Sequence, residues 1–281
     1  MIEAPPVTIP VLERYSDRIE RIYPSPMTGT PRASVVIVAY GTPPEVLQRN
    51  VELVSGEGIE VIVIDNSPSG SSNPFERSGA GYVAMRGNAG VCVGRNLGAV
   101  LARAAIVIYL DDDALPAEGF VEAHLREHSD PRVLAVRGRC LPRTRNLPNR
   151  LAFHYDLGPE RIPSPIDLEG NSSFKRAELL ACGGFNEALP LAGGWEGVDL
   201  SYRLVMRSGD PASVLYSPVP TIRHDYKANA FELLTKLIRH RRNLGEMSRG
   251  QVDLNAFLLR YERERNPLHR MRRALLVYRS P

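Results

Sequence analysis

The chain has 281 residues, 43% of them hydrophobic, and its 35 Lys and Arg stand against 32 Asp and Glu for a net charge of +3. That hydrophobic fraction excludes a disordered chain, and the nearly balanced charge gives no reason to expect nucleic acid as a partner. The three cysteines, Cys92, Cys140 and Cys182, are too widely and irregularly spaced for a zinc site or a disulfide framework, so we expect a reduced, cytoplasmic protein.

The N-terminus shows no sign of a targeting segment. It lacks the charged and apolar parts of a signal peptide, and no apolar run approaches the roughly 18 residues of a membrane span. Residues 1–32 are rich in Pro and without periodicity, which predicts an N-terminal extended arm with the core beginning after it.

Strands and helices alternate over the next part of the chain. Continuous β-branched runs predict strands that are buried on both faces. The strands are expected at 33–40, 59–67, 81–85 and 104–113, with helices from 42–44 onward and over 91–103. This alternation predicts an α/β fold with a parallel, right-handed sheet.

Polar residues cluster where these strands end. In such sheets ligands bind at the carboxyl ends of the strands, near the point where the strand order reverses. Tyr40 with Gly41, and Asp65 with Asn66, follow two of the strands and indicate a nucleotide pocket. The alternative is that Asp65 and Asn66 only cap a turn.

The last of these strands runs into three carboxylates, Asp111, Asp112 and Asp113. Their mutual repulsion is relieved by a divalent cation, because hard oxygen ligands suit Mg²⁺ or Mn²⁺ and the ion's remaining positions can take diphosphate oxygens. The alternative is a solvated or capping acidic cluster.

The segment RGNAGVCVGRNLG (86–98) is neither a dinucleotide-binding GxGxxG nor a Walker A loop. Its glycines stand four residues apart from Gly90 onward, which favours a helix packed closely on the sheet. Asn88, Arg95 and Asn96 are then expected to offer donors toward the strand ends, with Arg95 facing a diphosphate. For Arg95, a surface ion pair is the alternative.

The second half is less regular. We expect a strand at 133–140, a Pro-rich acceptor-binding loop over 141–170, a short helix ending at Cys182 and a helix within 193–209. A short strand before His224, an amphipathic helix from about 229 and a final helical stretch near 252–264 complete the pattern.

Two positions in this half have the chemistry of a site. Gly194 and Trp195 precede Glu196, which we expect to face a cavity as a general base, whereas Asp199 in the first helical turn is better explained by the helix dipole. His224 follows an apolar strand, where a neutral imidazole would complete a metal site; an ordinary polar contact is the alternative.

Taken together, the ordered motifs resemble those of the family-2 glycosyltransferases. They are VVIVAYGTPP, VIVIDNS, GNAGVCVGRNLG, VIYLDDDALP, ACGGFNEALP, GGWEGVDLSYRL and RHDYKANAFELLTKLIRHRRN, which cover about residues 33–247. The resemblance implies a GT-A fold, a Rossmann-like, mostly parallel sheet flanked by helices, with an acceptor-side subregion. The expected organisation is an arm at 1–32, a GT-A domain at 33–250 divided into donor and acceptor halves at 115/116, and a basic C-terminal helical extension at 251–281.

By this resemblance, the donor is a UDP- or dTDP-linked sugar held by the first half. Ala39 and Tyr40 would flank the base or ribose, Asp65 would bond the base, and Arg95 would approach the diphosphate. Asp112 would lie near the ribose. The full set expected at the donor is Ala39, Tyr40, Gly41, Asp65, Asn66, Asn88, Gly90, Arg95, Asn96, Asp111 and Asp112.

The resemblance also implies a metal ligand set and a base. Asp111 and Asp113 would bracket a Mn²⁺ or Mg²⁺ ion, with Asp113 as the direct ligand and His224 as a late one. The family usually carries two acids before the acceptor-side helix, and here the pair reads Glu196-Gly197. We therefore expect inverting transfer with Glu196 as base and Asp199 in reserve.

Rival functions make different predictions. A pyrophosphorylase would need a basic, Gly-rich loop after the first strand, which AYGTPPEV lacks, and the glycine spacing argues against a dehydrogenase. A nucleotide-sugar-binding protein with little or no turnover is the serious rival, since Gly197 removes an acid. The acceptor is expected to be a glycan, a lipid-linked molecule or a small molecule. The basic C-terminus suits either peripheral membrane contact or packing on the domain or in a homodimer.

Overall fold

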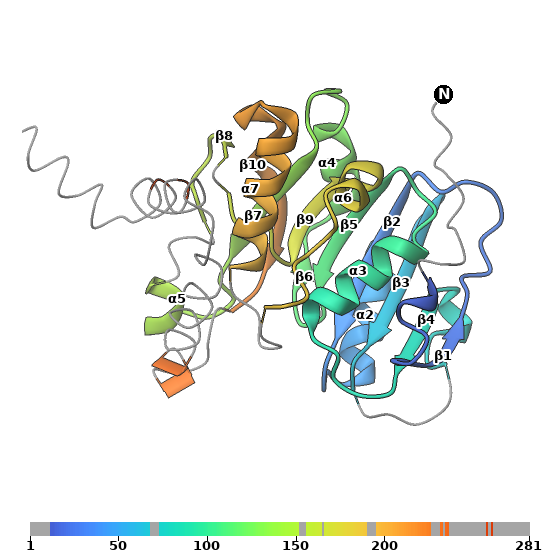
Figure 1. The fold of residues 1–281 in the computed structure, drawn as a ribbon. Coiled ribbons are helices and arrows are strands. Elements are labelled where there is room, and N and C mark those ends of the chain that lie inside the picture. The colour runs from blue at the N-terminus through green and yellow to red at the C-terminus, as the bar shows by residue number, and fades with distance from the viewer. Residues whose placement is uncertain are drawn as a thin grey trace, which may run out of the picture.

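The computed structural model describes residues 12–67, 73–151, 156–164, 166–189 and 195–225, together with six single positions after residue 230. One sheet runs through these residues in the order β1-β4-β3-β2-β5-β9-β7-β10-β6, and β8 pairs with β10 off that path (Figure 1). The strands are β1 Ile19–Tyr23, β2 Ala33–Ala39, β3 Ile59–Asp65, β4 Gly81–Met85, β5 Ile106–Asp111, β6 Leu115–Pro116, β7 Ala135–Leu141, β8 Ile162–Pro163, β9 Asn171–Lys175 and β10 Val214–Arg223.

Helices cover both faces of this sheet. They are α2 Pro44–Val54, α3 Val91–Leu101, α4 Phe120–Glu127, α5 Leu147–Leu151, α6 Arg176–Ala181 and α7 Glu196–Ser208, with short 3-10 helices η1 Glu76–Ser78 and η2 Pro211–Ser213. Apolar residues of α3, α6 and α7 share one core cluster, and those of α2 and α4 share another. Alternate residues of β2 enter the two clusters, so this strand is buried on both faces, as its continuous apolar run predicted.

The first half confirms the predicted parallel sheet. Strands β4, β3, β2 and β5 are parallel neighbours, the helices α2 and α3 begin where they were predicted, and α3 ends close to its predicted limit. The glycine spacing also has the predicted cause. A Cβ on Gly94 or Gly98 would collide with Val38 or Val36, so these glycines let α3 lie directly on β2.

The second half contains a strand that the sequence did not predict. β9 runs antiparallel between β5 and β7 at the centre of the sheet. Its sequence, NSSFK, is polar, yet four of its residues are buried. Ser173 lies between the rings of His124 and His128, at 2.9 Å and 2.8 Å, and Asn171 Oδ1 is 3.0 Å from His124 Nε2. The equally unpredicted helix α4 supplies both histidines, so partners from another element make this buried polar strand stable.

The prediction that the core begins after residue 32 was wrong. Tyr15 and Ile19 are buried in the same core cluster as α3, and β1 pairs antiparallel with β4 at the edge of the sheet. The sequence did not predict this strand, because its residues IERIY lack the alternation of apolar and polar residues that marks a strand.

The end of the chain is largely outside the described residues. The predicted amphipathic helix from about 229, the helical stretch near 252–264 and the basic extension 251–281 all fall there, apart from isolated helical positions. Within the described part, none of the helices combines the length and the apolar character needed to cross a bilayer. The proposed division of the chain at 115/116 and 250 stays a prediction.

Candidate active site

The sheet reverses its strand order between β2 and β5. The chain proceeds from β2 through β3 to β4 on one side, and then returns to place β5 on the other side of β2. Val38 is the register partner of Asp111, so the loop after β2 and the acidic triplet leave the sheet together. This is the location at which α/β sheets bind ligands.

Asp112 fastens these two segments to each other. Its Oδ2 accepts hydrogen bonds from Tyr40 N, at 3.0 Å, and from the Thr42 hydroxyl, while its carbonyl accepts from Asn50 Nδ2 at 2.7 Å. Burial raises the pKa of Asp112 to about 6, although both side-chain hydrogen bonds oppose the shift. Asp112 therefore joins the loop after β2 to the acidic triplet, and Tyr40 beside it is 58% exposed.

The residues expected at the nucleotide base mainly shape turns. Asp65 accepts from Ser67 N at 2.8 Å and from the Tyr82 hydroxyl at 2.9 Å, so the turn-capping alternative holds for it. Asn66 is buried, and its amide bonds Ala89 N and Gly90 O of the following loop.

Three further expected donor contacts also belong to this framework. Asn88 Oδ1 accepts from Gly90 N at 3.0 Å, which fixes Gly90 in its left-handed conformation with φ 92°. Gly41, with φ 70°, donates to Ser67 Oγ at 2.8 Å and so joins the two loops. Ala39 is fully buried in the core, and its carbonyl accepts from Asn66 N, so a direct contact of Ala39 with a base is not supported.

Arg95 does not face an open diphosphate site. Its guanidinium is buried, with Nη2 3.4 Å from Asp111 Oδ1 and Nη1 3.4 Å from Glu196 Oε1. It lies over the ring of Phe185, 5.1 Å from the centroid. Burial lowers the pKa of Arg95, but the two carboxylates outweigh this and hold it above its ordinary value. In this structure Arg95 links the acidic triplet to Glu196, and the expected contact with a diphosphate stays a prediction.

Asn96 is also committed elsewhere. Its Nδ2 donates to Phe185 O at 2.9 Å and to Glu187 Oε1 at 2.8 Å, and its Oδ1 accepts from Phe185 N at 2.7 Å. It therefore holds the loop 183–189 and offers no donor to the strand ends, contrary to the prediction.

Asp113, the last residue of the triplet, is paired with His224. Asp113 Oδ1 is 3.0 Å from His224 Nε2, although the two residues are 111 positions apart. Burial lowers the pKa of His224, but the hydrogen bond that His224 donates to Asp113 and the charges of Asp111 and Asp113 raise it to about 10. Burial raises the pKa of Asp113, and the hydrogen bond and charge of His224 reverse this to bring it below its ordinary value.

The predicted three-residue ligand set is only partly assembled. Among the described residues, no three His, Cys, Asp or Glu side chains are gathered so that they could hold a metal ion. Asp111 is engaged by Arg95 and backed by Gly170, where a Cβ would collide with its carboxylate. The Asp113 carboxylate fits Mn²⁺ or Mg²⁺ in donor type, whereas His224, with its pKa raised to about 10, must lose a proton before its Nε2 can bind an ion.

The start of α7 supplies the acceptor-side acids. Glu196 is 3% exposed and reaches Arg95, whereas Asp199 is bound by Arg203 at 2.9 Å and 2.6 Å on one oxygen. That ion pair supports the structural explanation for Asp199. Trp195 has φ 71°, a strained value for a residue with a side chain, and Gly194 lies outside the described residues.

The presence of glycine at position 197 has a steric explanation. A Cβ at this position would collide with Asp167 Oδ1 and with the backbone of Leu168, so no acid fits where the family usually has one. The loop 166–170 occupies that space instead. Asp167 and Glu187 are acids near the site that sequence reasoning missed. Their position in irregular loops gave no signal, although Glu187 lies inside a motif that carried the resemblance.

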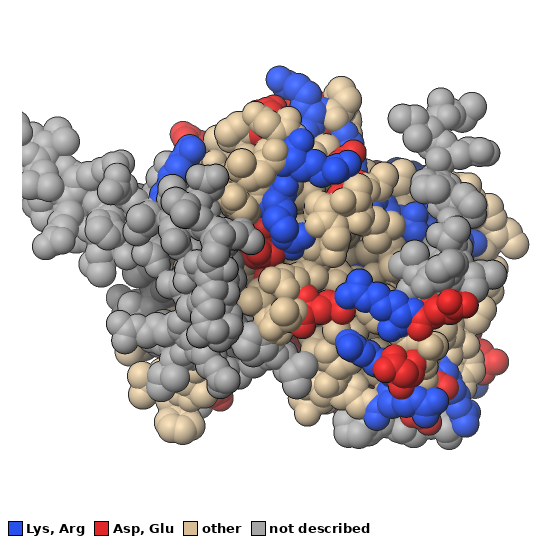
Figure 2. All heavy atoms as spheres, viewed as in Figure 1, with Lys and Arg blue, Asp and Glu red and all other residues tan. Residues whose placement is uncertain are grey.

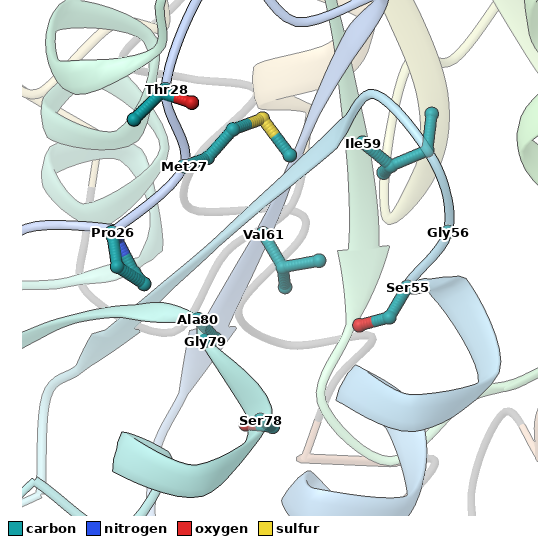
Figure 3. Close-up of a pocket in the computed structure, with 10 residues that line it drawn as sticks. All are labelled: Pro26, Met27, Thr28, Ser55, Gly56, Ile59, Val61, Ser78, Gly79 and Ala80. Carbon is teal, nitrogen blue, oxygen red and sulfur yellow. The ribbon is translucent and has the colours of Figure 1, made fainter.

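A cavity of about 450 Å³ lies at the opposite end of the sheet, where β3 and β4 begin (Figure 3). None of its lining residues is charged. Two of its hydroxyls, those of Ser55 and Ser78, already donate to Val51 O and Phe75 O. It offers nothing to neutralise a diphosphate, so we place the candidate site at the carboxyl ends of β2 and β5.

The family described as glycosyl transferase family 2 matches residues 34–185, more than half of the chain. This chain belongs to glycosyl transferase family 2. The match begins at β2 and ends at Phe185, so it includes the acidic triplet and excludes both the N-terminal segment and α7.

Relatives of this family 2 member carry related descriptions. Two curated proteins, both called pre-mycofactocin glycosyltransferase and both from Mycobacterium tuberculosis strains, are 26% identical over 226 residues. The match covers 73% of this chain and 45% of the relatives, so the chain spans less than half of their length.

Solved structures show the same fold. A mannosyltransferase from Pyrobaculum calidifontis in complex with GDP-Man and Mn²⁺ superposes with a TM-score of 0.57 at 20% identity, covering 85% of this chain and 68% of that one. GalNAc-T7 with UDP, GalNAc and Mn²⁺ gives 0.55 at 17% identity, covering 72% and 45%. The predicted GT-A fold, with its mostly parallel sheet flanked by helices, is thus confirmed.

Proposed function

We propose that this chain is a metal-dependent, inverting glycosyltransferase that moves a sugar from a nucleoside diphosphate sugar to an acceptor hydroxyl. The observation that carries the proposal is the convergence, at the carboxyl end of β5, of Asp113 with His224 and of Asp111 with Glu196 through Arg95. Residues from both halves of the sheet meet there, at the point where the strand order reverses.

The roles follow from this geometry. A divalent ion held by Asp113 and His224 would neutralise the departing diphosphate. Glu196 accepts the proton of the acceptor hydroxyl as its oxygen attacks the anomeric carbon from the side opposite the leaving group. Arg95 orients Glu196 through their ion pair, and the exposed side chain of Tyr40 offers a stacking surface to the nucleobase.

The donor class is a nucleotide sugar, with UDP- or dTDP-linked sugars as our first choice. The two similar structures were solved with GDP-Man and with UDP, so the identity of the nucleobase has to be tested by experiment. The acceptor is a glycan, a lipid-linked molecule or a small molecule. Contact of the basic C-terminus with anionic lipid, and a homodimer, stay predictions about residues beyond the described part.

A nucleotide-sugar-binding protein with little turnover is the second candidate. It is favoured by the absence of room for an acid at Gly197 and by the neutralisation of Asp199 through Arg203. Both observations leave Glu196 as the base at the start of α7.

The test is nucleotide release from a panel of UDP-, dTDP- and GDP-sugars, with Mn²⁺ and with EDTA, alongside thermal shift with each nucleotide. A transferase releases nucleotide slowly without acceptor and in a metal-dependent manner, and the Asp113→Ala variant does not. Stabilisation by a nucleotide sugar without any release supports the binding protein. If no nucleotide sugar stabilises the protein and no nucleotide is released, both candidate functions are contradicted.

A further inference from the structure

The carboxylate of Glu187 joins the N-terminal segment to the acceptor-side loop 183–189. Its Oε1 accepts from the Tyr15 hydroxyl at 2.6 Å and from Asn96 Nδ2 at 2.8 Å, and its Oε2 is 2.8 Å from Arg14 Nη2. The three donors come from parts of the chain that are 91 to 173 residues away. Hydrogen bonds to a charged group are about twice as strong as neutral ones, so this carboxylate is held firmly.

The N-terminal side of this contact is a fixed part of the sheet. The Tyr15 ring is 2% exposed and packs in the same core cluster as α3, and burial together with Glu187 raises the pKa of its hydroxyl well above the ordinary value. Arg18 O accepts from Arg86 N at 2.8 Å, and β1 pairs with β4 directly afterwards. Glu187 is therefore bound to the segment that leads into β1, and β1 lies at the edge of the sheet (Figure 1).

The other side of the contact leads to Glu196. Asn96, which donates to Glu187, also donates to the carbonyl of Phe185 and accepts from its backbone N–H. The ring of Phe185 lies under the guanidinium of Arg95, which contacts Glu196. Leu189, two residues after Glu187, packs with Val198 and Trp195 at the start of α7.

We propose that Glu187 is a positioning residue of the transfer reaction, and that Tyr15 and Arg14 of the N-terminal segment act through it to hold the loop 183–189 under Arg95 and Glu196. This inference rests on the proposed function, because Glu196 is the base in that reaction. Both the N-terminal segment and Glu187 lie outside residues 34–185, which match the family. Figure 2 shows acidic and basic side chains interspersed on the face in view.

The test compares Glu187→Ala, Glu187→Gln and Tyr15→Phe with the control Arg32→Ala. Arg32 belongs to the same N-terminal part and forms an equally short ion pair, but with Glu122 on α4 and mostly exposed. We expect Glu187→Ala to lower kcat for transfer about tenfold and Tyr15→Phe about threefold, the range of effects carried through packed contacts. Donor affinity in Mn²⁺ and donor hydrolysis without acceptor stay within about twofold of the parent, since such distant contacts leave the Asp113 side untouched.

Glu187→Gln distinguishes positioning from bulk packing. It keeps the side-chain shape and one oxygen for Tyr15 or Asn96, so it should recover most of the lost kcat. Equal losses of kcat, donor affinity and melting temperature in all three variants would assign Glu187 a purely structural role and overturn the proposal.

Trp195 gives a readout that needs no turnover. It is the single Trp of the chain, and it packs with Leu189 beside Glu196. Loosening the loop should raise acrylamide quenching of its fluorescence about twofold in Glu187→Ala, whereas Arg32→Ala leaves it unchanged. Unchanged quenching in a folded Glu187→Ala variant overturns the brace. Increased quenching in a chain that transfers no sugar would instead count against the proposed function alone.

Discussion

The two halves of the sheet hold their polar residues in different ways. In the first half, β2 to β5, Asp65, Asn66 and Asp112 are bound by loops within the same half. In the second half, His224 and Glu196 reach back across the sheet to Asp113 and Arg95. The first half thus fixes its own polar loops, whereas the contacts on which the proposed chemistry rests join the two halves. Variants at the crossing contacts should therefore affect turnover much more than variants within the walls.

The largest effect is expected from Asp113→Ala, which removes the contact with His224 and a metal ligand. Metal stabilisation of a leaving diphosphate contributes several kcal/mol, so turnover should fall by at least about 10³-fold and donor affinity should fall with it. Steady-state kinetics and titration with nucleotide and Mn²⁺ measure both. Asp130→Ala is the matched control, because its partner Arg132 is a neighbour on the surface. Normal turnover in Asp113→Ala would remove the metal site from β5.

Glu196→Gln tests the other crossing contact. General base catalysis contributes about 10²–10⁴-fold, so kcat should fall by at least about 10²-fold while donor affinity is retained. Asp199→Asn on the same helix should keep kcat within about threefold, because an acid in the first turn contributes only about 0.3–1 kcal/mol to the helix. If the two variants exchanged these effects, Asp199 would be the base and its pairing with Arg203 would have to open during turnover.

Gly197→Asp asks whether the usual second acid can be restored. The side chain would meet Asp167 and Leu168, and overpacking of this kind costs about 1–3 kcal/mol of unfolding free energy. We expect lower stability in urea unfolding and no gain in turnover. Gly87→Asp, at a glycine with open space around its Cβ, provides the comparison. A Gly197→Asp variant that is as stable as the parent and turns over faster would contradict this prediction, and would show that the loop 166–170 can move to accept the side chain.

The last prediction concerns the pH dependence of stability, rather than turnover, and the buried strand β9. Burial lowers the pKa of His124 to about 3 and that of His128 to about 4. The unfolded chain takes up these protons below about pH 6.5 but the folded chain does not, so stability falls as pH drops from about 6.5 toward 4, by up to about 1.4 kcal/mol per pH unit for each histidine. Urea unfolding at several pH values measures the slope. His128→Gln should reduce it, and an unchanged slope would contradict the assignment.

The sequence by itself determined the first half of the fold. Continuous β-branched runs can be buried only between two layers, and helices between them force parallel strands, so β2 to β5, α2 and α3 followed from local pattern. The same pattern predicted that the acidic triplet lies at the end of a strand and that the glycines of α3 allow the helix to pack closely on the sheet. These are properties of neighbouring residues.

Only the tertiary structure decided the rest. β9 is polar and became a central strand because His124 and His128 from α4 satisfy it, and β1 joined the sheet because β4 left an edge to pair. Arg95 and Asn96 lie on the predicted helix, yet their partners Glu196, at the start of α7, and Phe185, in a loop, are 101 and 89 residues away. A side chain's partner depends on which distant segment fills the space beside it, and a linear pattern carries no information about that.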